Sequence, residues 1–361
     1  MAGTNGQLHD VRVHTNVGDL RDEWSALADR SGNVFATPEW AEAWLPHFAP
    51  GAALRLLACH DASGALRAVW PLYLEARGPI RVVRLLGHGP ADELGPACAP
   101  EDRVAAGEAL HSALRGRRLG AQALLAERLG AGTPWPALLG GRVLHREASP
   151  VLPVAGRTWE EFLAEQSRNF REQAGRRRRR LEREHDVELA MTTDPATLPA
   201  DLDALYALHA RRWTEGESDA FAGTAGAFHR DFAAVALQHG WLRLWLLRIG
   251  GEPVAAWHGF RFGGADSFYQ AGRDPEWDRW SVGSVLLTHT VRCAFEDGMR
   301  EYRLLRGGEG YKGRWATEDR PVEIVVAAAT PLARPAIAAA SKITGSRRLR
   351  EVARRALGRP R

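Results

Sequence analysis

The stretch from Trp241 to Trp315 constrains the fold of this 361-residue chain more than any other. It opens with three apolar runs, which Gly250-Gly251 and Gly263-Gly264 separate. A Gly-Gly pair between two strand-like runs indicates a β-hairpin. The pattern therefore predicts three consecutive strands, over residues 241–249, 254–262 and 265–271.

A helix and a further strand follow these runs. The helix is predicted over residues 281–297 and ends at Gly298, a favourable residue for a helix C-terminus. A short strand over residues 301–305 comes next. The chain then enters a glycine-rich cluster, whose polar residues Glu309, Tyr311 and Lys312 directly follow that strand.

Strand, hairpin, strand, loop, helix and strand is the core order of the GNAT acyltransferase fold. The stretch resembles the CelD-like and FemAB-related branch of that superfamily. Ser281-Val282-Gly283 stands where the branch carries a Ser-Pro-Gly turn, while Arg303 and Gly308 replace two of its acidic residues. The residues that match its G-x-E-x-Y-K type signature are Gly307, Glu309, Tyr311 and Lys312.

The order of predicted elements occurs twice along the chain. A strand, two helices, three strands, a helix and a strand are expected before residue 150, and the same order follows it. We therefore predict an α/β (α+β, mixed-sheet) protein with two tandem GNAT-like units, each a mixed sheet flanked by helices. The expected boundaries are 1–150 for a structural or acceptor-binding unit, 151–330 for the acyltransferase unit, and 331–361 for a basic tail.

A long helix is predicted from Thr158 to Glu184. Thr158 and Glu161 form a capping-box pattern at its start. Its most unusual feature is the run of five arginines from Arg176 to Arg180. Successive helical residues are ~100° apart around the axis, so these side chains cannot all face solvent. We expect some of them to face the protein, a cleft or an anionic partner such as tRNA.

The start of the helix at residue 281 is the expected site for an acyl carrier. In GNAT proteins the carrier's pyrophosphate binds the free amides that open the central helix, where the helix dipole attracts phosphate. The resemblance assigns this role to Arg279, Ser281, Gly283 and Ser284. The alternative is an ordinary helix start, with Ser281 as its N-cap.

The cluster after the last strand is the expected catalytic centre. Tyr311 could protonate a departing thiolate, Glu309 could accept the proton of an amine, and Lys312 could bind an anion or an oxyanion. The alternative is a glycine-rich surface turn without a catalytic role. Five further residues are candidates for substrate binding, namely His209, Trp213, His258, Tyr269 and Gln270.

Composition excludes several other classes of function. The three cysteines are far apart and the histidines show no metal-ligand spacing, so we expect no metal site and a cytoplasmic protein. No apolar run reaches the ~20 residues that a membrane span requires. The net charge of +4 is uneven, because residues 168–184 and 341–361 are strongly basic and the remainder is acidic.

The sequence therefore favours transfer of an acyl group from acetyl-CoA or another acyl-CoA to a small-molecule or peptide amine. A second hypothesis is aminoacyl-tRNA-dependent peptide-bond formation of FemAB type, with tRNA bound through Arg176–Arg180. A third is a non-catalytic accessory protein of envelope or polysaccharide assembly, which the acids missing at Arg303 and Gly308 leave open.

Overall fold

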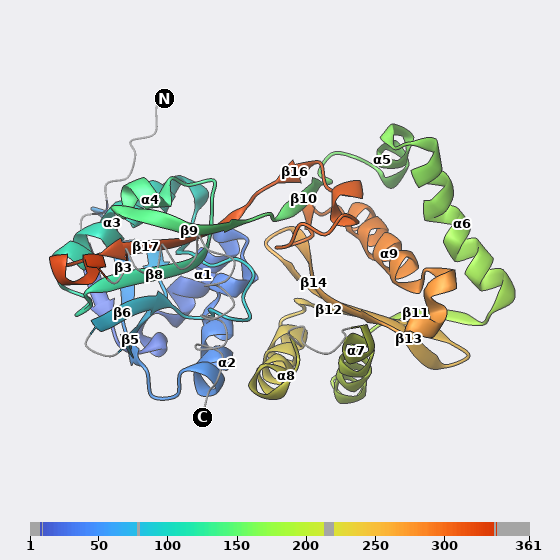
Figure 1. The fold of residues 1–361 in the computed structure, drawn as a ribbon, viewed down its shortest axis with the longest axis horizontal. Helices are drawn as coiled ribbons and strands as arrows, with labels where there is room; N and C mark the ends of the chain where they lie inside the picture. The colour runs from blue at the N-terminus through green and yellow to red at the C-terminus, as the bar shows by residue number, and fades with distance from the viewer. Residues whose placement is uncertain (1–7, 9, 78–79, 213–219, 336, 338–361) are drawn as a thin grey trace. The chain divides into compact units, whose positions relative to one another are not determined.

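A computed structural model describes residues 8, 10–77, 80–212, 220–335 and 337 (Figure 1). The chain divides into two compact units. One comprises residues Ser149–Asp319, and the other comprises the described residues before and after that segment. Both units contain β-sheets flanked by helices, as the sequence predicts.

The first unit holds a four-stranded sheet in the order β1-β3-β4-β7 and a six-stranded sheet in the order β2-β5-β6-β8-β17-β9. Its helices and strands are β1 (Asp10–His14), α1 (Arg21–Ser31), α2 (Pro38–Phe48), β2 (Ala53–Leu54), β3 (Leu56–His60), β4 (Leu66–Trp70), β5 (Leu72–Arg77), β6 (Ile80–Leu85), β7 (Ala97–Cys98), α3 (Arg103–Arg115), β8 (Ala123–Gly130), α4 (Trp135–Leu138), β9 (Gly141–Glu147) and β17 (Val322–Ala328).

Strand β17 corrects the predicted domain boundaries. We expected residues 322–328 in the second unit, but β17 pairs antiparallel with both β8 and β9 in the first. The chain therefore leaves the first unit after Ala148 and returns to it at Arg320. Pro150 and Pro153 bound strand β10, at the predicted boundary between the two units. Most of the predicted tail, residue 336 and residues 338–361, lies outside the described residues.

The second unit is built on one seven-stranded sheet, in the order β11-β12-β13-β14-β15-β10-β16. Its helices and strands are β10 (Pro150–Pro153), α5 (Trp159–Glu165), α6 (Arg168–Glu184), β11 (Val187–Met191), α7 (Leu198–Arg212), α8 (Gly223–Gln238), β12 (Leu242–Ile249), β13 (Glu252–Phe262), β14 (Ala265–Arg273), α9 (Val282–Glu296), β15 (Glu301–Arg303) and β16 (Glu318–Asp319).

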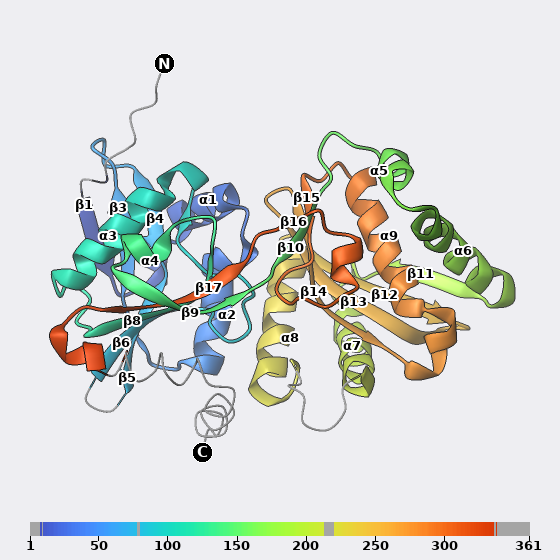
Figure 2. The same ribbon diagram turned by 45° about the horizontal axis from the view of Figure 1, so that its top comes forward.

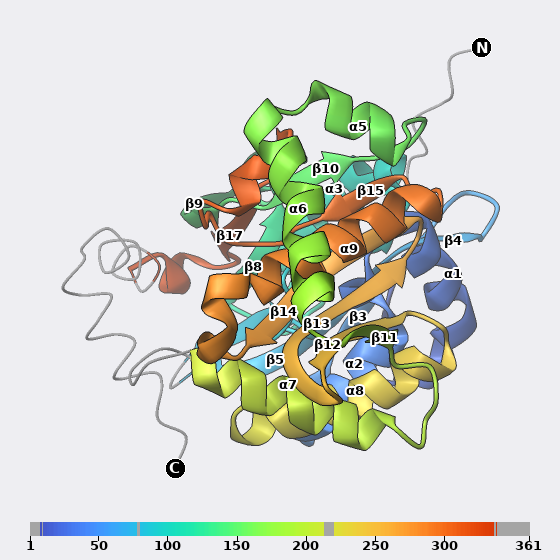
Figure 3. The same ribbon diagram turned by 90° about the vertical axis from the view of Figure 1, so that its right-hand side faces the viewer.

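Helices cover both faces of this sheet, because its central strands are apolar on both sides. Helices α7 and α8 pack on one face and α9 on the other (Figures 1 and 2). Helix α6 forms an outer layer against α9 (Figure 3). None of the described helices is long and apolar enough to cross a membrane.

The single helix predicted from Thr158 to Glu184 is two helices. The predicted capping box is present, since Thr158 and Glu161 exchange hydrogen bonds at the start of α5. That helix ends at Glu165, and Ser167 caps a new one by accepting from the Phe170 amide at 3.2 Å. Arg171 donates to the carbonyls of Ala164 and Gln166, which satisfies the end of α5. The sequence did not reveal this second cap.

Aromatic side chains hold α5 and α6 against the rest of the second unit. Trp315 stacks on Trp159 and Phe162 of α5, with ring centroids 6.4 and 6.2 Å apart. Phe170 of α6 meets Trp315 edge to face at 4.9 Å. Phe295 of α9 lies 5.3 Å from Phe162. Offset-stacked and edge-to-face pairs add to the energy of area burial, so this cluster fixes α6 over α9.

Gly272 sets how closely α7 approaches β14. A Cβ atom at this position would overlap the backbone of Leu208 and His209 in α7. We predict that Gly272→Ala lowers the free energy of unfolding by about 1–3 kcal/mol, the usual cost of overpacking a core. Gly313→Ala is the matched control, because its added Cβ would meet no heavy atom within 4 Å. Urea unfolding of both variants measures the difference, and equal stabilities would contradict the close packing of α7.

Candidate active site

A cavity of about 480 Å³ opens in the second unit where strands β14 and β15 separate. The two strands are parallel and pair only over residues 265–267 and 301–303, while β14 continues to Arg273. The cavity lies beside this continuation of β14, below the first turns of α9 and against α6. Its volume falls within the ~300–1,000 Å³ of small-molecule sites.

The start of α9 faces this cavity. Ser281 takes a left-handed conformation, with φ of 55°, and its side chain does not cap the helix. No acidic residue occupies the first turn, so the first amides of α9 remain available to an anion. Ser281, Gly283 and Ser284, which we predict to bind the carrier, line the cavity. Arg279, the fourth predicted residue, does not line the cavity. It is exposed, and its guanidinium lies 5.4 Å from the centroid of the Trp280 ring.

Aromatic residues form much of the remaining wall. Trp257 of β13 and Phe268 of β14 contribute from the sheet, and Phe170 contributes from α6. Tyr311 lines the cavity and meets the Phe268 ring edge to face at 6.4 Å. The cavity can therefore hold an apolar group beside a phenolic hydroxyl.

Two other members of the predicted catalytic cluster lie outside the cavity lining. The Lys312 ammonium is buried, donates to the Arg306 carbonyl at 2.7 Å and pairs with the Glu309 carboxylate at 2.9 Å. Gly307 has φ of 114°, and a Cβ there would collide with the Glu309 carboxylate. These contacts hold the loop that carries Tyr311, rather than presenting Lys312 and Glu309 to a ligand.

Three arginines line the cavity that sequence reasoning did not assign to it. Arg177 comes from α6, Arg273 from the end of β14, and Arg314 from the short 3-10 helix Lys312–Arg314. Arg273 pairs with Asp278, which also lines the cavity. The expectation that some of Arg176–Arg180 face a cleft holds for Arg177. Its place could not be read from the sequence, because all five residues are arginine.

The predicted substrate-binding residues lie elsewhere. His209, His258 and Tyr269 are buried on the face of the sheet covered by α7 and α8, opposite the cavity. His209 lies with Nδ1 3.0 Å from the Ala271 carbonyl, and the Tyr269 hydroxyl is 3.3 Å from His229 Nε2. Gln270 pairs with His258 across the strands and is not part of the described lining. Trp213 lies outside the described residues.

Strand alternation explains this correction. Trp257 and Phe268 point to the cavity, so their neighbours His258 and Tyr269 point to the opposite face. The register between β13 and β14 shifts at His258, which leaves Tyr269 as the extra residue of a bulge. The sequence showed that apolar and polar residues alternate along these strands, but not which set of side chains faces the cavity.

Comparisons with known proteins agree with this arrangement. The sequence profile of the acetyltransferase (GNAT) domain family matches residues 168–313, which include all the residues that line the cavity except Arg314 and Trp315. No curated protein matches the chain significantly. Residues 168–313 are a GNAT domain. This domain lies within the second unit of the chain.

Solved structures resemble the whole chain in fold. FemX has 12% identity and a TM-score of 0.63, and the match covers 91% of this chain and 100% of FemX. The C-terminal DUF2156 domain of a protein assigned as lysylphosphatidylglycerol synthetase from Agrobacterium fabrum has 10% identity, coverage of 91% and 97%, and a TM-score of 0.58. L-PGS from Bacillus licheniformis has 14% identity, coverage of 90% and 96%, and a TM-score of 0.53.

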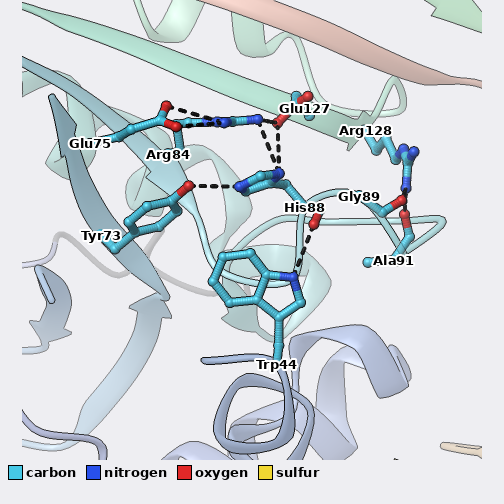
Figure 4. Close-up of polar contacts among 9 residues, drawn as sticks. All are labelled: Trp44, Tyr73, Glu75, Arg84, His88, Gly89, Ala91, Glu127 and Arg128. Carbon is cyan, nitrogen blue, oxygen red and sulfur yellow. Dashed lines mark hydrogen bonds and ion pairs between the residues drawn. The ribbon is translucent and has the colours of Figure 1, made fainter. Parts of the chain in front are cut away.

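In the first unit, the position that corresponds to the GNAT cavity is occupied by the chain itself. Its strands β6 and β8 are also parallel, and the connection from β6 to α3 meets β8 at one point. Leu94 of this connection forms a parallel bridge with Leu129, and the Arg128 guanidinium donates to the Gly89 carbonyl at 2.6 Å and to that of Ala91. The protein's own backbone thus fills the gap beside β8 (Figure 4).

A polar network fixes this connection to the sheet (Figure 4). Arg84 Nη2 donates to His88 Nδ1 at 3.0 Å and lies 2.5 Å from Glu127. Because a guanidinium only donates, His88 Nε2 carries the proton and donates to the Tyr73 hydroxyl at 2.6 Å. Burial, and then the charge of Arg84, lower the pKa of His88 to about 4. The neutral imidazole therefore bridges strand and loop at physiological pH.

The buried histidines of the GNAT domain predict a loss of stability in acid. Burial lowers the pKa of His258 to about 3, and burial followed by the nearby His258 and His209 lowers the pKa of His229 well below its usual value. Histidine in an unfolded chain titrates near ~6.5. The unfolded chain therefore gains protons as the pH falls below that value, whereas the folded domain does not.

We expect each such histidine to remove about 2 kcal/mol of stability between pH 7 and pH 5, with full stability above the unfolded pKa. Urea unfolding at several pH values measures this slope. His258→Leu removes one titrating group while keeping an apolar side chain in the core, so its slope should be shallower by about one proton. A slope identical to that of the unmodified protein would contradict the assignment.

Proposed function

We propose that the protein transfers an acyl group from an acyl-CoA thioester to an amine, in the cavity beside β14. The observation that carries this proposal is the composition of that cavity. It combines the uncapped start of α9, which suits phosphate, with an aromatic wall that suits an apolar arm and an acyl group. The fold and the GNAT domain support acyltransferase chemistry in general, and the CoA donor is our inference.

The reaction requires one bond to form and one to break. The neutral amine attacks the thioester carbonyl, the new C–N bond forms, and the C–S bond breaks to release a thiolate. Tyr311 is the hydroxyl that we assign to protonate this thiolate, because it lines the cavity beside Phe268. Solvent receives the amine's proton and restores that of Tyr311.

We revise the roles of the neighbouring residues. Asp278, the one carboxylate in the described lining, is already paired with Arg273. Glu309 is paired with Lys312. We therefore assign Glu309 and Lys312 to holding the Tyr311 loop, and no longer to proton transfer or anion binding. The amine would then react in its neutral form, without a dedicated carboxylate base.

Aminoacyl-tRNA as the donor is the second candidate, which the resemblance to FemAB-type proteins implies. The observation that favours it is the exposed arginine surface of α6, where Arg176, Arg179 and Arg180 face outward. Three arginines of this helix pair with glutamates four residues later, Arg168 with Glu172, Arg178 with Glu182 and Arg180 with Glu184. These pairs reduce the charge that the surface offers to a phosphate backbone.

Thermal melts separate the two donors. If acyl-CoA is the donor, acetyl-CoA should stabilise the protein by about 2.7 kcal/mol at a hundredfold excess over its Kd. If tRNA is the donor, acetyl-CoA should give no shift, and tRNA binding should weaken linearly with the logarithm of salt concentration. A millimolar concentration of acetyl-CoA that leaves Tm unchanged would contradict the CoA proposal.

The proposed acid has a test with a close internal control. Tyr311→Phe keeps the ring against Phe268 and removes the hydroxyl, so kcat should fall by about 10²–10⁴-fold while KM for the donor hardly changes. Tyr269→Phe removes a hydroxyl on the opposite face of the same sheet and should leave kcat unchanged. A panel of amines with labelled acetyl-CoA must first identify an accepted substrate. Undiminished turnover by Tyr311→Phe would remove Tyr311 from the mechanism.

A further inference from the structure

Two arginines from different elements line the cavity without a carboxylate to neutralise them. Arg177 of α6 donates to the amide oxygen of Gln173 at 2.8 Å, a neutral partner on its own helix. Arg314 belongs to the 3-10 helix after Tyr311. Within the described parts of the chain, neither guanidinium forms an ion pair with an aspartate or glutamate.

The position of Arg177 along α6 explains why it has no carboxylate partner on that helix. Arg178 and Arg180 each have a glutamate four residues later, at the spacing that favours helical ion pairs. The residue four positions after Arg177 is Leu181, which is fully buried in the core. The helix therefore pairs Arg178 and Arg180 with glutamates, but offers no glutamate at this spacing to Arg177 on the cavity side.

The two charges also disfavour one another. Burial, and then the positive charge of Arg314, lower the pKa of Arg177. Asp278 cannot compensate, because it is engaged by Arg273. The described wall of the cavity therefore carries excess positive charge, held in place by the packing of Phe170 on Trp315. A bound anion would relieve this repulsion.

We propose that Arg177 and Arg314 together bind an oxyanion, a carboxylate or phosphate, carried by the substrate of this cavity. Planar guanidinium groups suit such oxyanions, because they donate paired hydrogen bonds in fixed geometry. The inference rests on the proposed acyl-transfer site and makes it more specific. The ligand has an apolar portion against Trp257 and Phe268 and an anionic group at the Arg177–Arg314 pair. Helix α6 and the 3-10 helix after Tyr311 supply this pair in addition to the start of α9.

Calorimetric titration with inorganic pyrophosphate tests the pair without assuming any donor. Arg177→Gln and Arg314→Gln should each weaken binding by about tenfold, the usual effect of losing a charge-assisted hydrogen bond. The double variant should lose less than the product of the two, because both arginines hold one anion. Arg176→Gln is the matched control. It lies one residue away on α6, is exposed, and is not part of the described lining.

Three results would overturn the proposal. The first is no binding of pyrophosphate to the unmodified protein at low salt. The second is an equal loss of affinity in all three single variants, and the third is unchanged affinity in Arg177→Gln and Arg314→Gln. Circular dichroism confirms folding. Arg177→Lys keeps the charge without the planar fork, so it should restore part of the affinity lost by Arg177→Gln. If Arg177 only supported the fold and no anion bound at this pair, Arg314→Gln would not change the affinity for pyrophosphate.

The source of the anion can then be distinguished with CoA derivatives. If the acyl group supplies a carboxylate, succinyl-CoA should bind more tightly than acetyl-CoA, and Arg177→Gln should abolish the difference. If the carrier supplies a phosphate, CoA should bind more tightly than dephospho-CoA, again only while both arginines are present. Failure of every CoA compound alongside arginine-dependent pyrophosphate binding would overturn the CoA donor and keep the anion site.

Discussion

The cavity depends on the packing of Trp315 against helices α5 and α6. Its indole stacks on Trp159 and Phe162 of α5 and meets Phe170 of α6 edge to face. Without these contacts α6 would have little to hold it, because most of its surface is charged and Leu181 is its one fully buried side chain. The same contacts place Arg177 in the cavity wall. Tertiary packing, rather than the helix itself, thus fixes the position of α6.

The two units show how one strand arrangement gives an open site in one case and a closed one in the other. In the second unit, β14 continues past its pairing with β15, and side chains line the resulting space. In the first unit, Leu94 bridges to Leu129 and Arg128 binds two loop carbonyls, so backbone occupies that position. Glu101 and Asp102 also precede α3, where they disfavour phosphate near its N-terminus. These features favour a single acyl-carrier site, in the second unit.

Much of the fold could be predicted from the sequence, because hairpin glycines and apolar periodicity are local signals. The three strands after Trp241 and the helix that ends before Gly298 were predicted within a few residues. Strand β17 was assigned to the wrong unit, since pairing partners distant in sequence leave no local signal. The site followed the same rule. Ser281, Gly283 and Tyr311 belong to motifs. Arg177 instead reaches the cavity through the packing of α6, and Arg314 through the 3-10 helix after Tyr311.

The arginines of α6 therefore lie in two different electrostatic environments. Arg178 and Arg180 pair with glutamates one turn later, and these side chains are exposed to solvent. Such ion pairs contribute little energy, and salt screens them. On the cavity side, Arg177 is half-buried beside Arg314. Burial and the neighbouring positive charge both disfavour its charged form until an anion binds. A polyanion gripping the outer side would meet many weak, salt-sensitive contacts, whereas a small anion in the cavity would meet two arginines already in place. The selectivity of this helix for a ligand thus lies on its buried side.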